Sequence, residues 1–194
     1  MVDLSGNIAL DQELAKKCIA GDRQAQERFY NQYKGRMMAV CVRYMSDKDL
    51  AADVFQEAFI KAFRLLPKWR GEGPLEAWLR KIIVSTALNE LRKKKMISLE
   101  EVNDGFVLSP QFNSAIDHLS EQELLKLVAA LPQGYRTVFN LYVMEGFDHK
   151  EIAALLGISD NTSRTQLLKA RVMLQKRILE SEGKLEQLST KMRS

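Results

Sequence analysis

The sequence has few of the residues that break helices or bind metals. Its 194 residues include ten glycines, four prolines, two cysteines and two histidines. Runs of alternating Val, Ile and Thr are missing, whereas Leu, Ala, Lys, Glu and Gln are plentiful, which favours helices over strands. Cys18 and Cys41 form no CxxC pair, and His118 and His149 are isolated. We therefore expect an all-α protein with buried, reduced thiols and with neither a metal nor a cofactor.

Long apolar runs and catalytic signatures are also missing. No apolar run approaches the length of a bilayer span, and the N-terminus lacks a basic stretch followed by an apolar core. The sequence contains no nucleophile–base pair, phosphate-binding glycine motif or metal-ligand spacing. We therefore expect a cytoplasmic protein that does not insert into a membrane, has no small-molecule substrate and is not an enzyme.

Charge is unevenly distributed, although the formal net charge is only +4. Residues 61–95 carry ten Lys and Arg against three acids, and residues 96–125 carry six acids and no Lys or Arg. Residues 160–177 then carry five Lys and Arg against one Asp. A small net charge says little about partners, but clustered cations indicate binding to a polyanion. The order basic, acidic, basic therefore marks two segments as candidates for nucleic-acid contact.

Helical spacing begins in the first third of the chain. Apolar residues recur every three to four positions on both sides of a break at Gly21-Asp22. Ser46 or Asp47 is placed to cap a further helix that ends before Pro67. One face of that helix is apolar, and the opposite face carries Asp53, Gln56 and Glu57.

A loop and another helix follow. Residues 68–74 contain two glycines and a proline, a composition typical of a loop that joins two helices. The next helix is predicted over residues 75–95 and ends in four consecutive cations, which suit a helix C-terminus. Trp78 falls on the apolar stripe of this helix and is predicted to be a core residue. Trp69 lies at the loop edge, where packing and base contact are equally compatible with the sequence.

The periodicity is lost over residues 96–120, which are acidic and contain Ser109-Pro110. Such a segment is typical of a linker. Helical signals resume with a capping box that begins at Ser120. We therefore predict two small helical domains joined by an acidic linker. The predicted boundaries are a first domain 1–96, the linker 97–120, a second domain 121–180 and a C-terminal tail 181–194 with no assigned function.

The second domain has helix-turn-helix spacing. A short helix begins near Glu151, Gly157 lies in the turn, and a capped second helix covers residues 160–174. Apolar residues of the two helices are expected to pack together. That arrangement leaves polar and basic side chains of the second helix for DNA, namely Thr162, Ser163, Arg164, Gln166 and Lys169. The alternative is an ordinary helical hairpin whose polar face is only solvated.

Both halves of the chain resemble one family, the extracytoplasmic-function sigma factors. The second domain resembles the −35-reading region four, in Leu131-Pro132-x-x-x-Arg136-x-Val138-Phe139, Gly146-Phe147 and Glu151-Ile152-Ala153 through Lys169-Ala170-Arg171. The first domain resembles region two, in Asp53-Val54-Phe55-Gln56-Glu57-Ala58-Phe59 and Trp78-Leu79-x-x-Ile82 through Leu88-Asn89-x-Leu91-Arg92. The two matches have the order and spacing of the family and span most of residues 10–180.

The resemblance implies a sigma factor that binds core RNA polymerase, recognises −35 and −10 promoter elements, helps to melt the −10 region and directs transcription initiation. It implies that Asp53, Gln56 and Glu57 contact the clamp helices of the largest polymerase subunit. It also implies that Arg171 contacts the −35 element. The loop and the helix after it are expected to hold an unpaired base of the −10 element. The implied −10 residues are Lys68, Trp69, Arg70, Gly71, Gly73, Arg80, Ser85, Asn89, Arg92 and Lys93.

Two residues depart from the family pattern. Ser85 stands where many relatives have Asn, and Gln166 stands where Arg is frequent. A glutamine can read adenine bidentately where an arginine would favour guanine. The preferred promoter sequence is therefore not carried over from the family.

Several alternatives remain open from the sequence. A helix-turn-helix regulator that acts independently of core polymerase has the same C-terminal pattern, but it would bind an operator without polymerase and would not open strands. The acidic linker resembles a segment that threads the polymerase cleft, and a plain flexible tether has the same composition. The family resemblance also implies an anti-sigma factor as a further partner.

Overall fold

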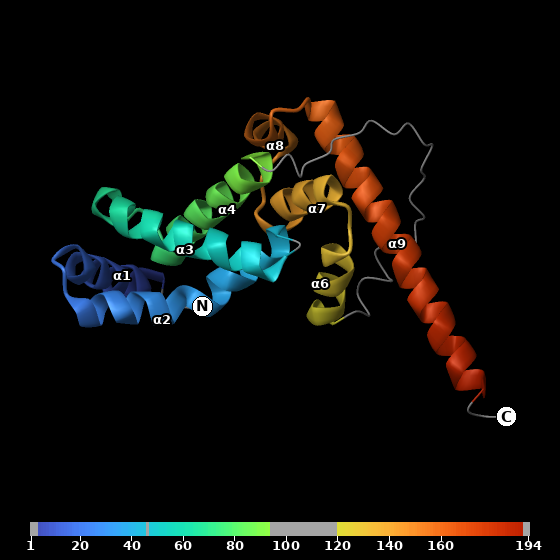
Figure 1. Ribbon diagram of the computed structural model, residues 1–194, viewed down its shortest axis with the longest axis horizontal. Helices are drawn as coiled ribbons and strands as arrows, with labels where there is room; N and C mark the ends of the chain where they lie inside the picture. Colours follow the sequence, from blue (N-terminus) through green and yellow to red (C-terminus); the bar gives the residue numbers. More distant parts are fainter. Residues whose placement is uncertain (1–3, 46, 94–119, 192–194) are drawn as a thin grey trace. The chain divides into compact units, whose positions relative to one another are not determined.

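The computed structural model describes residues 4–45, 47–93 and 120–191, and all the elements in them are helical. The expected all-α class is therefore confirmed. The chain divides into two compact units, residues 1–94 and 95–194 (Figure 1). Nearly all of the predicted linker lies outside the described residues. None of the described helices combines the length and the apolar character that a membrane crossing requires.

The described residues of the first unit form four α-helices and one 3-10 turn. These elements are α1 (Leu4–Ile19), α2 (Arg23–Tyr44), α3 (Lys48–Leu65), η1 (Leu66–Lys68) and α4 (Leu75–Lys93). Asp22 begins α2 by accepting hydrogen bonds from the amides of Gln24 and Ala25, at 2.9 and 3.2 Å. Asp47 caps α3 through two bonds of 2.8 and 2.9 Å. Each such cap contributes about 1 kcal/mol to helix stability.

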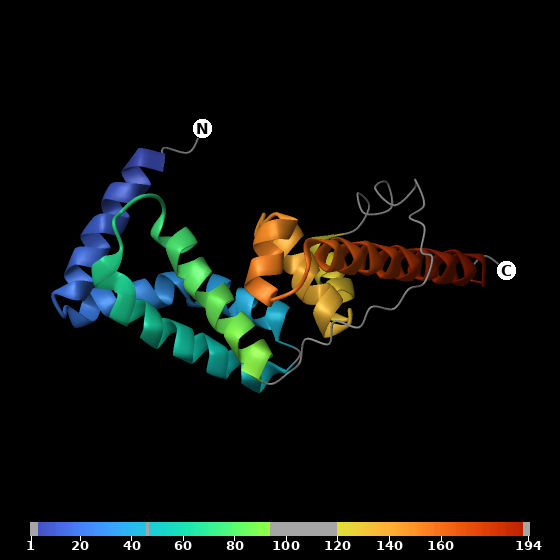
Figure 2. The same cartoon turned by 90° about the horizontal axis from the view of Figure 1, so that it is seen from above.

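The core of this unit is formed by α2, α3 and α4, which pack on one another. Phe29 of α2 is fully buried, and its ring centroid lies 6.0 Å from Phe59 and 5.4 Å from Phe63, both on α3. Edge-to-face aromatic pairs of this kind add to the stability that comes from area burial. Leu79 and Ile83 of α4 are fully buried as well. Figure 2 shows α3 and α4 side by side, joined by the loop at 69–74.

Within residues 120–191, the described part of the second unit, there are four α-helices and a short π-helical turn. These are α6 (Glu121–Ala129), α7 (Gln133–Phe139), η2 (Asn140–Met144), α8 (His149–Leu156) and α9 (Asp160–Lys191). The predicted capping box is confirmed, because Ser120 and Glu123 exchange side-chain and backbone bonds at the start of α6. A second capping box begins α8, between Asp148 and Glu151.

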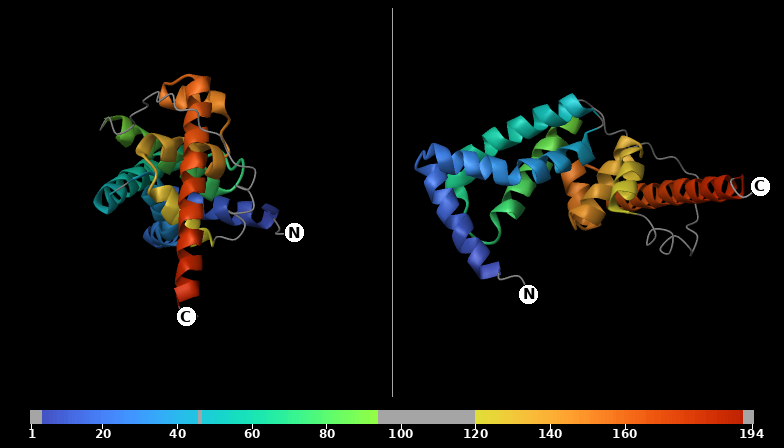
Figure 3. Two further views of the ribbon diagram at one scale, coloured as in Figure 1. Left: turned by 90° about the vertical axis from the view of Figure 1, so that its right-hand side faces the viewer. Right: turned by 90° about the horizontal axis from the view of Figure 1, so that it is seen from below.

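Helix α9 is much longer than the predicted 160–174 segment. It continues to Lys191 as one helix of 32 residues (Figure 3). The predicted tail 181–194 therefore belongs to α9 as far as Lys191. The buried side chains Leu167, Ala170, Leu174 and Ile178 lie at helical spacing on one stripe of α9. That stripe packs on α7 and α8 and fixes the rotation of α9 about its axis.

The Leu131-Pro132-x-x-x-Arg136 motif has a structural role in the second unit. Pro132 precedes the first residue of α7, where its missing amide costs nothing. Arg136 is 3% exposed, and its Nη1 donates to the carbonyl oxygen of Ala129 at 2.7 Å. Burial lowers the pKa of this guanidinium. The arginine therefore ties the C-terminus of α6 to α7.

Candidate nucleic-acid interface

A groove lies along the loop between η1 and α4. It is lined by Lys68, Trp69, Arg70, Glu72, Gly73, Pro74, Ala77, Trp78 and Lys81. Both tryptophans are half-buried, so each keeps part of its ring accessible. The prediction that Trp78 is a core residue is therefore wrong. Its position on α4 lies beside the fully buried stripe of Leu75, Leu79 and Ile83, not on it.

Local backbone geometry forms this loop. Pro67 lies in the first turn of η1, and the amide of Trp69 closes that turn on the carbonyl oxygen of Leu66 at 3.1 Å. Gly71 and Gly73 have φ angles of +73° and +114°. Residues other than glycine rarely adopt positive φ angles, so these two glycines allow the chain to reverse between the helices.

The groove brings together four predicted −10 residues, Lys68, Trp69, Arg70 and Gly73, and adds Lys81. Sequence reasoning missed Lys81, although Pro74, Trp78 and Lys81 recur at helical spacing and share one face. Gly71 belongs to the same loop but does not line the groove. Arg70 lies 3.8 Å from Glu72, and both side chains are highly exposed. An exposed pair of this kind is weakly held, so the guanidinium can exchange its partner for a phosphate.

The remaining predicted −10 residues lie further along α4, outside the groove. Ser85 is half-buried, and its hydroxyl donates to the carbonyl oxygen of Ile82 at 2.9 Å. Asn89 and Arg92 are exposed and bonded to each other at 2.6 Å. Lys93 is exposed beside Glu90 at 3.5 Å, and Arg80 is half-buried. These side chains extend along α4 rather than forming one pocket with the tryptophans.

The predicted polymerase-binding residues lie together on the outer face of α3. Asp53, Gln56 and Glu57 are exposed and line one hollow with Ile60, Lys61 and Arg64. Sequence reasoning missed Ile60, which is 54% exposed. An exposed apolar side chain surrounded by polar residues has the composition of a helix-binding surface.

The helix-turn-helix has the predicted geometry. Gly157 ends α8 with a φ of +70°, and the Ser159 hydroxyl caps α9 by accepting from the Thr162 amide at 2.9 Å. Arg164 is exposed and pairs with Asp160 at 3.2 Å. Thr162 is half-buried. Both side chains lie at the N-terminal end of α9, the part of a recognition helix that approaches base edges.

Three predicted DNA residues are buried instead of exposed: Ser163, Gln166 and Lys169. Ser163 belongs to the buried stripe of α9, and its hydroxyl lies 2.9 Å from Nδ1 of His149 on α8. The prediction that Ser163 faces DNA is therefore wrong, because the residue joins the two helices of the motif. Gln166 and Lys169 flank the stripe, so the expectation that both are exposed is also wrong, and their contact with DNA stays a prediction.

Arg171 is half-buried, and its guanidinium lies 5.9 Å from the centre of the Tyr142 ring. That ring stacks on His149 at 4.7 Å. Burial, with Arg164 next in effect, lowers the pKa of His149. Arg171 therefore also packs within the second unit, in addition to any contact with DNA.

The outer face of α9 carries a residue that sequence reasoning missed. Leu168 is 36% exposed and follows Arg164 by one helical turn. An apolar side chain on such a face can contact a thymine methyl group. Its spacing of four residues from Arg164 puts both residues on one helix face, and this spacing could have identified Leu168 from the sequence.

Both cysteines are buried and free, as expected. Within the described ranges, no group of three or more His, Cys, Asp and Glu residues is placed to hold a metal ion. A helix-turn-helix in one unit and a basic, tryptophan-lined groove in the other define a DNA-binding protein.

Comparison with known proteins agrees with this class. Residues 29–96 match the family Sigma-70 region 2, and residues 114–174 match Sigma-70, region 4. The ECF RNA polymerase sigma-E factor of Haemophilus influenzae is 29% identical over 181 residues, which are 87% of this chain and 95% of that protein. The sigma-E factor of Escherichia coli K12 is 29% identical over 180 residues, 87% of this chain and 94% of that protein.

The chain is also similar to a third curated protein and to a solved structure. The RNA polymerase sigma-H factor of Pseudomonas aeruginosa is 28% identical over 179 residues, covering 86% of this chain and 92% of that protein. A solved structure of the sigma factor RpoE with the anti-sigma factor NepR from Bartonella quintana is 21% identical, with a TM-score of 0.47, covering 79% of this chain and 96% of that one. The chain belongs to the extracytoplasmic-function family of sigma factors. It directs transcription initiation with core RNA polymerase.

Proposed function

We propose that the two units divide promoter recognition between them, with the groove of the first unit capturing the −10 element and α9 of the second reading the −35 element. The observation that carries the proposal is the groove itself. Two half-accessible tryptophans lie in it with Lys68, Arg70 and Lys81. Aromatic stacking with adjacent cations is the usual way to bind an unpaired strand.

Strand opening costs free energy that contacts in such a groove can offset. Extruding a base from the duplex costs a few kcal/mol. Stacking on an aromatic side chain returns about 1–3 kcal/mol per base, and cations hold the phosphates on either side. The groove of this chain offers both types of contact within one loop and the first two turns of α4.

The outer face of α3 is proposed to dock on the clamp helices of the largest polymerase subunit. Asp53 and Glu57 supply negative charge there, Gln56 supplies hydrogen bonds, and Ile60 supplies apolar area. Charge at the rim of such a contact steers association, whereas a buried apolar side chain contributes most to affinity.

On the second unit, Arg164 and Thr162 are proposed to contact base edges or phosphates of the −35 element, with Leu168 on the same face. Arg171, Gln166 and Lys169 remain proposed contacts that would require their side chains to leave their present packing. Along α4, the exposed side chains of Asn89, Arg92 and Lys93 are proposed to contact the DNA backbone. Arg80 and Ser85 are half-buried and are proposed to contribute less exposed contacts.

Further properties follow from family membership and stay proposals. We infer a cytoplasmic protein without catalytic activity of its own, which is held inactive by an anti-sigma factor until it is released. The solved RpoE structure contains such a partner, NepR. The acidic segment at 97–120 is proposed to enter the polymerase cleft, and a simple tether is the alternative.

The test is promoter-dependent transcription by purified core polymerase with and without this chain, on a library of genomic fragments, with the RNA starts sequenced. Specific starts that share two spaced elements are expected only when the chain is present. A helix-turn-helix regulator would instead bind DNA fragments alone and give no new starts with core polymerase, and that result would overturn the proposal.

A further inference from the structure

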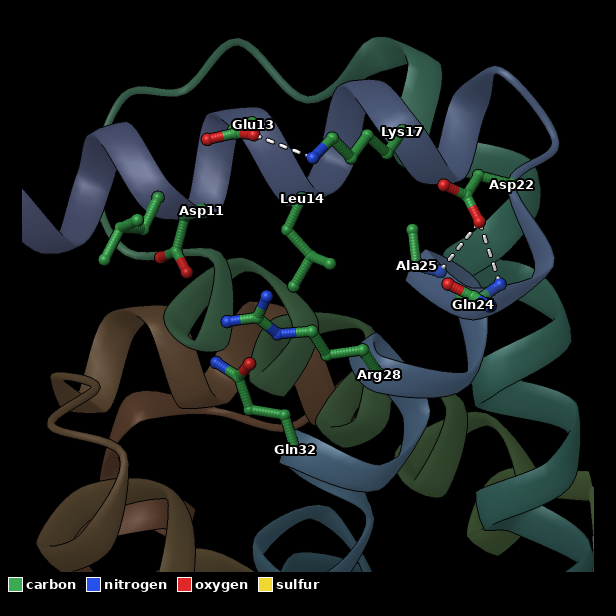
Figure 4. Close-up of a pocket in the computed structure, with 10 residues that line it drawn as sticks. Asp11, Glu13, Leu14, Lys17, Asp22, Gln24, Ala25, Arg28 and Gln32 are labelled. Carbon is green, nitrogen blue, oxygen red and sulfur yellow. Dashed lines mark hydrogen bonds and ion pairs between the residues drawn. The ribbon is translucent and has the colours of Figure 1, made fainter.

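We propose that Asp11, on α1, is a positioning residue for −10 recognition: its carboxylate fixes the start of α4 and thereby the groove that holds the unpaired strand. The inference rests on the proposed function of that groove. Helix α1 lies outside the span 29–96 that matches region 2. Asp11 is 9% exposed, and Figure 4 shows it on α1 with its carboxylate directed away from the helix axis, toward the side where Arg28 and Gln32 lie.

The first turn of α4 needs an acceptor that its own sequence lacks. The residue before the helix is Pro74, whose side chain has no acceptor atom. Asp11 supplies it from 64 residues earlier in the chain, because its Oδ2 accepts from the amide of Leu75 at 2.9 Å. A carboxylate at a helix N-terminus is also favoured by the helix dipole. Asp11 therefore performs for α4 the task that a local capping residue performs elsewhere.

The second carboxylate oxygen is held as well. Tyr33 of α2 donates its hydroxyl to Oδ1 of Asp11 at 3.1 Å, and Gln32 donates to the same hydroxyl at 3.0 Å. A buried carboxylate with both oxygens bonded is rigid, whereas one with unpaired oxygens would be costly. The loop is thus tied through Asp11 to both α1 and α2.

Two further contacts bind the same region. A Cβ atom on Gly71 would lie 2.5 Å from Nε2 of Gln12, so α1 lies directly against the backbone of the loop. Arg36 of α2 forms an ion pair with Glu76 in the first turn of α4. The loop between Trp69 and Pro74 therefore has the N-terminal helices on one side and the groove on the other.

Fixing the loop in advance reduces the cost of ordering it when the strand binds. Loss of the Asp11 acceptors leaves the Leu75 amide without its acceptor and the Tyr33 hydroxyl with Gln32 as donor but no acceptor, and both are buried groups that a relaxed loop would expose to water. Affinity for the unpaired strand should then fall, while the outer face of α3, which Asp11 does not contact, keeps its affinity for core polymerase.

The experiment compares four variants of the full chain as holoenzyme. Asp11→Leu keeps the number of side-chain heavy atoms but removes both acceptors, and Asp11→Asn keeps an acceptor for Leu75. Glu13→Gln is the matched control, because Glu13 is an exposed acid on the same helix that forms an ion pair with Lys17, at 2.8 Å. Gln12→Ala alters the contact with Gly71 at an exposed position that does not endanger folding.

Three quantities are measured: affinity for core polymerase, affinity of holoenzyme for a fluorescent non-template −10 strand from a promoter that the unaltered chain initiates, and amide hydrogen exchange over residues 69–78. We expect Asp11→Leu to bind the strand about tenfold more weakly and to exchange faster over the loop. Asp11→Asn should recover most of the affinity, Gln12→Ala should show a smaller loss, and Glu13→Gln should match the unaltered chain. Core affinity should be equal for all of them.

Equal strand affinity for Asp11→Leu and the unaltered chain would overturn the inference. A parallel loss of core affinity would overturn it too, because it would indicate a general role in folding. If the unaltered holoenzyme itself fails to bind the strand, the proposed function of the groove fails, and this inference falls with it.

Discussion

The hydroxyl of Ser163 on α9 lies 2.9 Å from Nδ1 of His149 on α8. This bond joins the two helices of the helix-turn-helix across the turn at Gly157. It turns Ser163 inward and Arg164, the next residue, outward. The face of α9 that is proposed to contact DNA is therefore set in part by a contact made inside the motif.

Arg164→Ala is expected to weaken −35 discrimination and to leave core affinity intact. The guanidinium is exposed and forms a weak surface pair with Asp160, so it is available to a base or phosphate. A bidentate base contact contributes about 1–3 kcal/mol to discrimination. The measurement is initiation from promoters with single substitutions in the −35 element. Lys176→Ala, an exposed cation later on α9, is the control. Initiation by Arg164→Ala that matches the unaltered chain on every promoter would contradict this placement.

Charge reversal on α3 is expected to lower affinity for core polymerase. Asp53→Lys and Glu57→Lys change exposed residues and leave the buried face of the helix untouched, so the fold should persist. The loss should be about tenfold or more for the double variant and should shrink at high salt. Glu27→Lys makes the same charge change on an exposed position of α2 and serves as the control. Unchanged affinity in the double variant would remove these residues from the interface.

Removing either tryptophan ring is expected to weaken capture of the −10 strand. Trp69→Leu and Trp78→Leu should each cost about 1–3 kcal/mol of strand affinity, because leucine cannot stack on a base. Trp78→Phe should retain most of the affinity. Fluorescence anisotropy of a labelled strand with holoenzyme measures the effect, and thermal unfolding of each variant checks that the half-buried ring is not needed for the fold. If Trp78→Leu binds as tightly as Trp78→Phe, the ring has only a packing role.

The second unit is expected to lose stability as the pH falls below about 6.5. Burial and Arg164 lower the pKa of His149 from its ordinary 6.5, while Asp160 opposes the shift. The folded state therefore binds fewer protons than the unfolded state below pH 6.5, and its stability falls as the solution is acidified. Above that pH both states are neutral at this residue and the effect vanishes.

The measurement is thermal unfolding at about pH 7.5 and pH 5.5, for the unaltered chain and for His149→Gln. The melting temperature of His149→Gln should fall less from the higher to the lower pH than that of the unaltered chain. An equal loss in both proteins would assign the pH dependence to other groups.

Local signals in the sequence were sufficient for the helices of both units. Asp47 and Ser120 cap the helices that their positions predicted, Asp22 caps α2 at the predicted break, and Gly157 takes the left-handed conformation expected of a turn. Caps and turns depend on residues within a few positions, so a sequence displays them directly. The polar face of α3 was predictable as well, since apolar residues at helical spacing leave Asp53, Gln56 and Glu57 on the opposite face.

The exposure of individual side chains was decided by tertiary packing. The sequence placed Trp78 on the apolar stripe of its helix, but only the packing of α4 on α2 and α3 determines that the ring lies at the edge of the core. Ser163, Gln166 and Lys169 are polar, and polarity alone predicted exposure. Their burial follows from the rotation of α9 against α7 and α8, which no local pattern specifies.

The sequence by itself determined the helical class, the helix-turn-helix and membership of the sigma factor family, because periodicity, caps and motif order are local properties of the chain. Only the tertiary structure decided which side chains share the groove and which residue holds its loop. The acceptor for Leu75 comes from Asp11, 64 positions away, and a hydrogen bond across that separation exists only once the chain has folded.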